Sequence, residues 1–318
     1  MTVTGVRTQG GYALLLFVVI LMGVSGVMFG GFLKDAKQSS VEQRFLHNQR
    51  VLKAAKQALL SYAYNYPVTV AGRGPGRLPC PDTDNSTTAN STGNCLNIGR
   101  FPFNAAGMNF YDARDASGER LWYAVSSAFA YNISPADNDV INISTNGTLT
   151  IHNQSGNLMY DGSVADASVG GIAAVIIAPG APIGRNGVAQ DRSITNGVDV
   201  RFDTTADTDP GIIDPVNYLD IFGALDNADF TNASAADGFV LGPIFDATGS
   251  VVVNDQIILI TAAEVRAAAQ KATLSAYRDA INDYLTRFGV YPWMNGYDAI
   301  VDPISPSPVN VIDVIPGR

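Results

Sequence analysis

The chain has 318 residues, a net charge of −9 and a pI near 4.6. Its length is enough for one large or two modest domains. The acidic balance argues against a nucleic-acid-binding protein, which would need a basic face. Only 15% of the residues are charged, and a polar surface with so little charge is typical of exported proteins.

The N-terminus combines a short polar leader, residues 1–11, with an uncharged apolar block, residues 12–33. At about 1.5 Å per residue the block makes a helix of roughly 33 Å, close to the thickness of a bilayer hydrocarbon core. Gly26 and Gly30 form a small-xxx-small pair that allows close helix packing in lipid. We therefore expect a transmembrane helix over residues 12–33.

Three interpretations of this segment compete. A cleaved secretory signal has an apolar region of only about 7–15 residues followed by small residues. Here the apolar run is longer and is followed by Lys34-Asp35-Ala36-Lys37, which is a poor cleavage site. A plain membrane anchor is the second interpretation. The third is a leader that is cut before the apolar helix, so that the helix stays on the mature protein.

The stretch Gln9-Gly10-Gly11-Tyr12-Ala13-Leu14-Leu15-Leu16 resembles the leader junction of type IV prepilins, which favours the third interpretation. The resemblance places the cut between Gly11 and Tyr12, and a cut after Gly10 is the alternative. Most major pilins carry Glu at the fifth mature position, where this chain has Leu16. That departure is similar to minor pilins and pseudopilins. The resemblance also implies helix contacts between subunits through Leu16 and the glycines Gly23, Gly26 and Gly30.

A second series of motifs resembles a group of large prepilin-like proteins. It runs through Arg77-Leu-Pro-Cys-Pro-Asp-Thr-Asp84, Gly99-Arg-Phe-Pro-Phe103 and Gly118-Glu-Arg-Leu-Trp-Tyr-Ala-Val125. Residues 173–180, Asn217-Tyr-Leu-Asp220 and Asn254-Asp-Gln-Ile-Ile-Leu-Ile-Thr261 extend it. The resemblance implies a filament subunit, a minor pilin or pseudopilin, rather than an enzyme, and it implies no cofactor. It implies a bacterial inner-membrane protein with a periplasmic body that then enters an extracellular or periplasmic filament.

The partners implied by this family are other pilin subunits, a prepilin peptidase, an inner-membrane assembly platform and membrane lipid before assembly, and no nucleic acid. The alternative function is a single-pass membrane-anchored periplasmic binding or adhesion module that does not polymerise.

Two cysteines, Cys80 and Cys95, lie fifteen positions apart. In an oxidising compartment they would form a disulfide. Closing a loop of that length stabilises a fold by about 3 kcal/mol in the chain-entropy model. Two unrelated buried thiols are the alternative. We favour the disulfide, which places the body outside the cytoplasm.

The expected fold class is α+β, with a long N-terminal helix packed on an antiparallel sheet. The helix has a membrane half, residues 12–33, and an amphipathic half, residues 34–66, which ends at Pro67. Helical spacing draws one apolar stripe along the second half, formed by Leu52, Ala55, Leu59, Tyr62 and Tyr66.

Residues 67–261 are predicted to form a β-rich globular domain that starts with a loop over 67–118. Strands are expected over 120–126, 172–178 and 251–261, the second of them central because it is wholly apolar. A hairpin is expected to turn at Asn146-Gly147 and to pair 141–145 with 148–152. Residues 184–250 are only weakly patterned.

Residues 262–318 are predicted to form a second amphipathic helix, 262–288, and a tail. Thr261 and Glu264 form a capping box at the start of this helix. Its stripe, Leu274, Tyr277, Ile281, Tyr284 and Phe288, repeats the spacing of the first helix. Ala58-Leu-Leu-Ser-Tyr62 also echoes Thr273-Leu-Ser-Ala-Tyr277, so an internal duplication is one hypothesis.

Few residues indicate other chemistry. Asp82 and Asp84 place oxygen ligands at alternate positions, which is the start of a calcium-binding loop, although a solvated turn is the alternative. The two histidines, His47 and His152, lie far apart in sequence, and a triad that uses His152 is the weakest hypothesis. The two tryptophans, Trp122 and Trp293, are expected to be core residues.

Overall fold

The structure is a computed structural model, and it describes part of the chain. The described residues are 41–67, 74–83, 95, 98–108, 110–130, 141–164, 169–185, 188–190, 192, 194–195, 198–199, 215–229 and 238–292. The chain divides into two units, Met1–Gln49 and Arg50–Arg318. In the first unit residues 41–49 are described, and they are helical. The sheets and the hydrophobic core lie in the second unit.

Helix α1 (41–67) ends at the predicted proline, and its apolar stripe is confirmed as core. Leu52, Ala55 and Leu59 are completely buried, and the two tyrosines that follow at helical spacing, Tyr62 and Tyr66, are at most 6% exposed. Burying one such side chain contributes about 1.5–3 kcal/mol. The stripe therefore fixes the part of α1 that belongs to the second unit onto the sheet.

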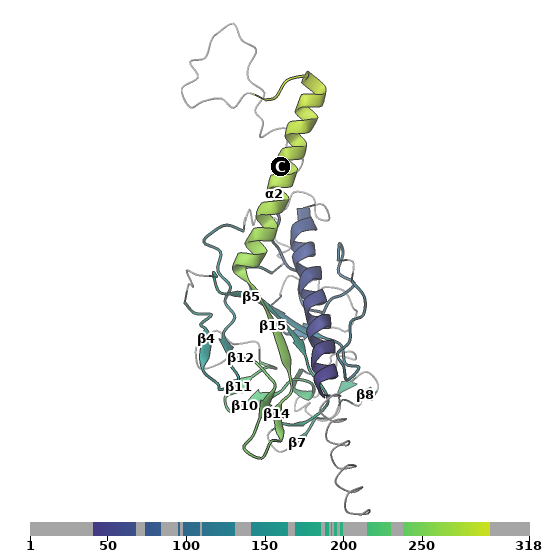
Figure 1. Ribbon diagram of the computed structural model, residues 1–318, viewed down its shortest axis with the longest axis vertical. Coiled ribbons are helices and arrows are strands. Elements are labelled where there is room, and N and C mark those ends of the chain that lie inside the picture. The colour runs from purple at the N-terminus through teal and green to yellow at the C-terminus, as the bar shows by residue number, and fades with distance from the viewer. Residues whose placement is uncertain are drawn as a thin grey trace, which may run out of the picture. The chain divides into compact units, whose positions relative to one another are not determined.

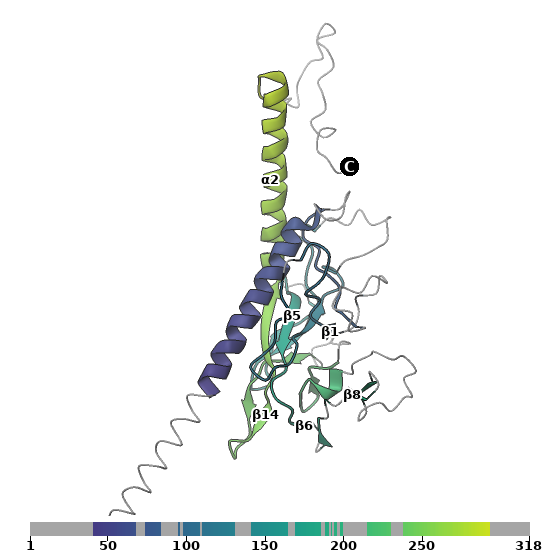
Figure 2. The ribbon, with the colours of Figure 1, turned by 90° about the vertical axis from the view of Figure 1, so that its right-hand side faces the viewer.

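The main sheet has four strands in the order β1–β2–β5–β15, all of them antiparallel to their neighbours. They are β1 (Gly99–Arg100), β2 (Trp122–Val125), β5 (Ile172–Ala178) and β15 (Gln256–Thr261). All seven residues of β5 are buried, so the predicted central strand is confirmed. Figure 2 shows α1 lying along this sheet.

The two faces of the sheet support two different cores. Because side chains alternate along a strand, Tyr123 and Ile176 join α1 in one hydrophobic cluster. Their neighbours Trp122 and Ile177 point to the opposite face and form a second cluster with Phe239. Trp122 is 1% exposed, which confirms it as a core residue. The other tryptophan, Trp293, lies outside the described residues.

Short strands surround the main sheet. β12 pairs in parallel with β3, which in turn pairs antiparallel with β4. The remaining strands form two-stranded antiparallel hairpins: β6 with β7, β8 with β9, β10 with β11 and β13 with β14. Their bounds are β3 (Ile151–His152), β4 (Leu158–Tyr160), β6 (Gly184–Arg185), β7 (Val188–Ala189), β8 (Ile194–Thr195), β9 (Val198–Asp199), β10 (Ile221–Phe222), β11 (Leu225–Asp226), β12 (Phe239–Val240), β13 (Ile244–Phe245) and β14 (Val251–Val253). A single 3-10 turn, η1 (Pro215–Asn217), precedes β10.

The predicted hairpin around Asn146-Gly147 is wrong. The turn forms earlier, because the Asn142 side chain accepts a hydrogen bond from the Ser144 amide and the Asn142 carbonyl accepts one from Thr145. Gly147 instead lies against the backbone of Ile172, where any Cβ would overlap. The hairpin of this region is β3–β4, and its turn begins at Asn153.

The predicted strand over 251–261 is also corrected, because it is two strands in different sheets. β14 pairs with β13, and β15 pairs with β5. The break falls at Asn254 and Asp255, whose backbone amides both donate to the carboxylate of Asp220. Amides that bond a side chain are not available to a strand ladder, so one continuous strand cannot form there.

Helix α2 (Ala262–Phe288) begins with the predicted capping box. The Thr261 hydroxyl accepts from the Glu264 amide, and the Glu264 carboxylate accepts from the Thr261 amide. Only its first third enters the core, through Ala262, Val265 and Ala269. The rest of α2 extends beyond the sheets of the second unit (Figures 1 and 2).

Within the part of the chain that the structure describes, no helix combines the length and the apolar character needed to cross a bilayer. The apolar block 12–33 lies outside that part.

Candidate functional site

The residues predicted to mediate processing and filament packing lie outside the described residues. They are Gly11, Tyr12, Leu16, Gly23, Gly26 and Gly30. Asp84, one of the two calcium candidates, is also outside. Asp82 is described and is 2% exposed, and its backbone forms an antiparallel bridge with Arg100. Among the described residues no group of three or more His, Cys, Asp or Glu side chains is placed to hold a metal.

The Leu-Pro-Cys-Pro motif forms a closed, buried segment beside α1. The predicted disulfide Cys80–Cys95 is present, with the two Cα atoms 4.9 Å apart. Upstream, the Arg77 guanidinium donates to the carbonyls of Ala128 and Ala130. The amide of Leu78 donates to the carbonyl of Phe129. The motif is therefore attached to the end of β2 and to the core, which gives it a structural role.

A buried cation lies on the side of the sheet away from α1. The Arg100 guanidinium carbon lies 4.3 Å from the centre of the Trp122 ring and 4.1 Å from that of Tyr218. It donates to the carbonyl of Arg120, while its Nε has no partner among the described residues. Burial lowers the pKa of Arg100 to about 10. Arg100 is therefore still a cation at neutral pH, held between two aromatic rings.

A second buried polar group, which we call the acidic cluster, is formed by Asp220, Asp255 and the polar side chains that bond them. Asp220 and Asp255 are at most 1% exposed. The Asp220 carboxylate accepts from Gln190 Nε2 at 3.0 Å and from the amide of Asn254 at 2.7 Å. The Asp255 carboxylate accepts from the Asp220 amide at 2.8 Å and from Asn227 Nδ2 at 2.9 Å. These bonds join the chain between β7 and the end of β11 to the two residues that directly precede β15.

Burial is the main cause that raises the pKa of both carboxyls. The pKa of Asp220 rises to about 6, and hydrogen bonds to its carboxylate partly oppose the shift. The pKa of Asp255 rises well above its usual range, because burial and the charge of Asp220 act in the same direction. The Oδ1 atom of Asp255 has no hydrogen-bond partner among the described residues. Both side chains are inaccessible to a substrate, so the cluster supports the fold rather than a reaction.

Little in the sequence indicated the acidic cluster. Asn217-Tyr-Leu-Asp220 and Asn254-Asp255 are ordinary segments of an Asp-rich chain, and they lie about 35 positions apart. A signal was present, since both segments belong to the motif series that resembles the large prepilin-like proteins. No spacing rule connects them, however, because the contact depends on how the chain returns to the main sheet.

The structure adds no support to the hypothesis of a catalytic triad that uses His152. His152 is 4% exposed in β3, between β12 and β4. A general base must reach the proton that it abstracts from a substrate. His47 lies on α1, in the described part of the first unit.

One flank of α1, beside the buried stripe, borders an open groove of about 330 Å³. Small and polar side chains of α1 line one side, and Gly107 and Phe110 line the other. The α1 residues are Ala54, Gln57, Ala58, Ser61 and Asn65. The second unit therefore covers the stripe of α1 and forms the opposite wall of the groove.

Comparison with known proteins identifies no relative. No protein-family model, no curated protein and no solved structure matches this chain.

Proposed function

We propose that the protein is a structural subunit, a minor pilin or pseudopilin, of a type IV pilus or a type II secretion-like filament. The observation that carries this proposal is the placement of α1. Its apolar stripe is buried against an antiparallel sheet, and the chain N-terminal to it contains the uncharged block 12–33. The folded body is thus built on α1, and the apolar block that precedes α1 in the sequence can anchor that body.

Two further observations support the proposal. The disulfide Cys80–Cys95 is expected in an oxidising compartment outside the cytoplasm. The acidic cluster and His152 are buried, which argues against a catalytic use of either. In the proposed function, residues 12–33 are held first by lipid and then by neighbouring subunits, and Leu16 in place of Glu suits a minor subunit.

The proposal is tested at the leader junction. The full chain is expressed in a bacterium with and without a prepilin peptidase, and the N-terminus of the membrane-extracted protein is determined by mass spectrometry. We expect a protein that starts at Tyr12 only when the peptidase is present. Gly11→Val should abolish this cut, whereas Gly10→Val should leave it intact.

Retention of Met1 in cells that process a control prepilin would contradict the filament function and favour the membrane-anchored binding or adhesion module. The exposed outer part of α2 is the observation that keeps this second function in consideration. Cleavage without recovery of the protein in sheared or periplasmic filaments would also argue for the module.

A further inference from the structure

Helix α2 has two different apolar faces. The inner face, Ala262, Val265 and Ala269, is buried in the core next to α1. At about 100° per residue, Leu274, Ile281 and Phe288 point roughly a third of a turn away from that face. They form an outer stripe that starts more than one turn beyond the last buried residue.

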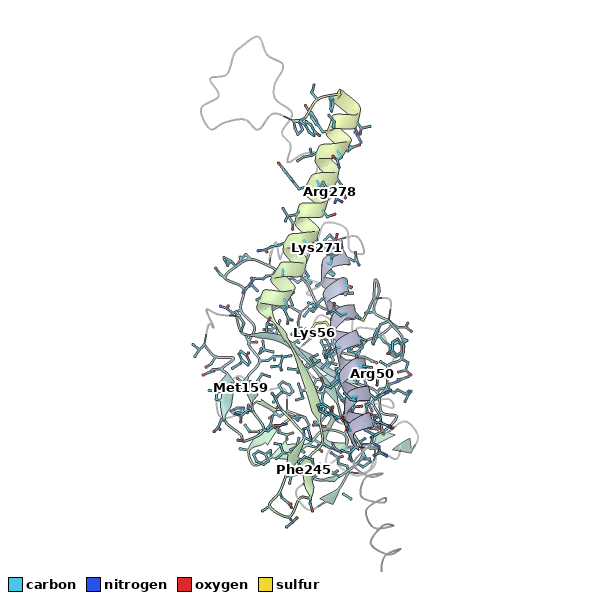
Figure 3. All side chains as sticks on the ribbon, in the orientation of Figure 1. Arg50, Lys56, Met159, Phe245, Lys271 and Arg278 are labelled. Atoms are coloured by element: carbon cyan, nitrogen blue, oxygen red, sulfur yellow. A yellow bond between two sulfur atoms is a disulfide. The ribbon has the colours of Figure 1, made fainter. Side chains whose placement is uncertain are left out.

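The outer stripe is exposed at its two ends and half-buried at Ile281. Leu274 is 69% and Phe288 is 57% exposed, and no residue of α2 beyond Ala269 belongs to the core of the described residues. Figure 3 shows this part of α2, from Lys271 past Arg278, with its side chains standing clear of the sheets. Large exposed apolar side chains in one row on a regular helix mark an interaction surface.

The outer part of α2 carries large apolar side chains at four positions that correspond to the buried stripe of α1. When Leu274 is aligned with Leu52, Ile281 falls on Leu59, Tyr284 on Tyr62 and Phe288 on Tyr66. Each helix carries an aromatic pair at the end of its stripe, with ring centres 5.8 Å apart for Tyr62–Tyr66 and 4.5 Å for Tyr284–Phe288. The sequence echo described above pairs Tyr62 with Tyr277, whereas this alignment pairs Tyr62 with Tyr284. The difference arises because this alignment matches the buried face of α1, which the structure identifies.

The binding partner of the α1 stripe is known from the structure. It is the apolar face of the four-stranded antiparallel sheet. Lys56, beside the stripe, donates to the Leu259 carbonyl of the edge strand β15 and forms an ion pair with Glu264, with Nζ and Oε1 2.7 Å apart. The alignment puts Arg278 at the position of Lys56. Arg278 is 69% exposed, forms an ion pair with its neighbour Asp279 and donates to the Ser275 hydroxyl.

We propose that the outer part of α2, residues 273–288, docks onto the apolar face of an antiparallel β-sheet in a partner protein, with Arg278 meeting an acidic group at the edge of that sheet. The surface is continuous with an established interface, since α2 leaves the core as one uninterrupted helix. The charge requirement follows from the role of Lys56. This inference does not depend on the filament function.

The partner sheet differs in shape from the sheet of this chain. Tyr277 and Leu285 occupy the positions of Ala55 and Ala63 of α1, both of which are completely buried against the sheet. Larger side chains there would overpack this sheet. A second copy that offers the same sheet is therefore disfavoured, and the partner is expected to have small residues opposite Tyr277 and Leu285.

The first experiment uses the sheet of this chain as the probe. In the full chain, residues 51–66 are replaced by the sequence of 273–288, with Ala kept at positions 55 and 63. We expect this chimaera to fold cooperatively, with a Tm within about 10 °C of wild type. The same chimaera with Tyr and Leu restored at those positions should melt at least about 5 °C lower. A first chimaera that does not fold would overturn the proposal, as would two equal melting temperatures.

The second experiment asks whether a second copy or another part of this chain covers the outer stripe. It uses the unaltered full chain in detergent micelles. We expect a monomer in which amides of 274–288 exchange faster than those of 262–269. A dimer that Ile281→Asp converts to monomer, while the matched Asn282→Asp does not, would assign the stripe to a second copy. Slow exchange of 274–288 in the monomer would assign it to another part of this chain. Either result would overturn the proposal.

Discussion

Asp220 and Asp255 accept hydrogen bonds from each other's backbone amides. The Asp220 amide donates to Asp255 Oδ2 at 2.8 Å, and the Asp255 amide donates to Asp220 Oδ2 at 3.2 Å. Two carboxyls that are buried side by side cannot both ionise without cost. The pair therefore attaches the residues before β10 to the start of β15 in a way that depends on protonation.

The first prediction concerns the pH dependence of stability. The pKa of Asp220 in the folded protein is about 6 and that of Asp255 is raised well above its usual range, against about 3.9 when unfolded. Between the unfolded and folded pKa values the folded state binds more protons than the unfolded state. The stability that the pair contributes is therefore present below about pH 4 and is lost as pH rises through 6. Asp255→Asn, which keeps an acceptor for Asp220 and Asn227, should therefore become more stable relative to wild type between pH 5 and pH 8.

Thermal melts of both proteins across this range check the prediction. Asp246→Asn is the control, because hydrogen bonds from Thr248 and Ser250 lower the pKa of this fully exposed carboxyl, so it is ionised in both states across this range and its replacement should leave the pH dependence unchanged. A wild-type minus Asp255→Asn difference that does not change with pH would contradict the coupling.

The second prediction concerns the ion pair between α1 and α2. Glu264→Gln preserves an oxygen acceptor for the Thr261 amide but removes the charge next to Lys56. Because both side chains are partly exposed, we expect a loss of only about 0.5–1 kcal/mol. Thr261→Ala, which removes the N-cap acceptor, should cost about 1 kcal/mol. A double-mutant cycle of Glu264→Gln with Lys56→Met, measured by urea unfolding, separates the ion-pair energy from any effect of Glu264→Gln on the helix cap. A zero coupling energy would rule out the ion pair.

The third prediction concerns the buried cation. Arg100→Lys keeps the charge but loses the planar guanidinium between Trp122 and Tyr218. A lysine is more strongly hydrated and cannot stack on two rings, so we expect a loss of about 1–3 kcal/mol. The exposed Arg278 is the matched control, and Arg278→Lys should change stability by less than about 0.5 kcal/mol. Equal effects of the two substitutions in urea unfolding would refute a special role for Arg100.

The fourth prediction compares the two stripes by the same substitution. Leu52 is completely buried and Leu274 is 69% exposed. Leu52→Ala should cost about 2–5 kcal/mol through lost burial and the cavity left behind. Leu274→Ala should change stability by less than about 0.5 kcal/mol, since alanine is also the better helix former. Comparable destabilisation by both would show that the outer stripe is covered within the chain.

Elements governed by local pattern were predicted well from the sequence. The stripe of α1, the end of that helix at Pro67 and the capping box at Thr261 depend on side chains within about one or two helical turns of each other. The hairpin at Asn146-Gly147 failed for the converse reason. An Asn-Gly pair favours a turn, but the close approach of Gly147 to Ile172 and the side-chain bond of Asn142 outweighed it.

The sequence by itself determined which surfaces are apolar, where helices begin and end, and that the wholly apolar stretch 172–178 is a central strand, because these properties are periodic along the chain. Only the tertiary structure decided which apolar stripe is buried and which is exposed. Leu52 and Leu274 belong to the same pattern, yet one faces a sheet assembled from segments between 99 and 261 and the other lies beyond it. The pairing of Asp220 with Asp255 was decided in the same way, since it requires separate segments to meet at one edge of that sheet.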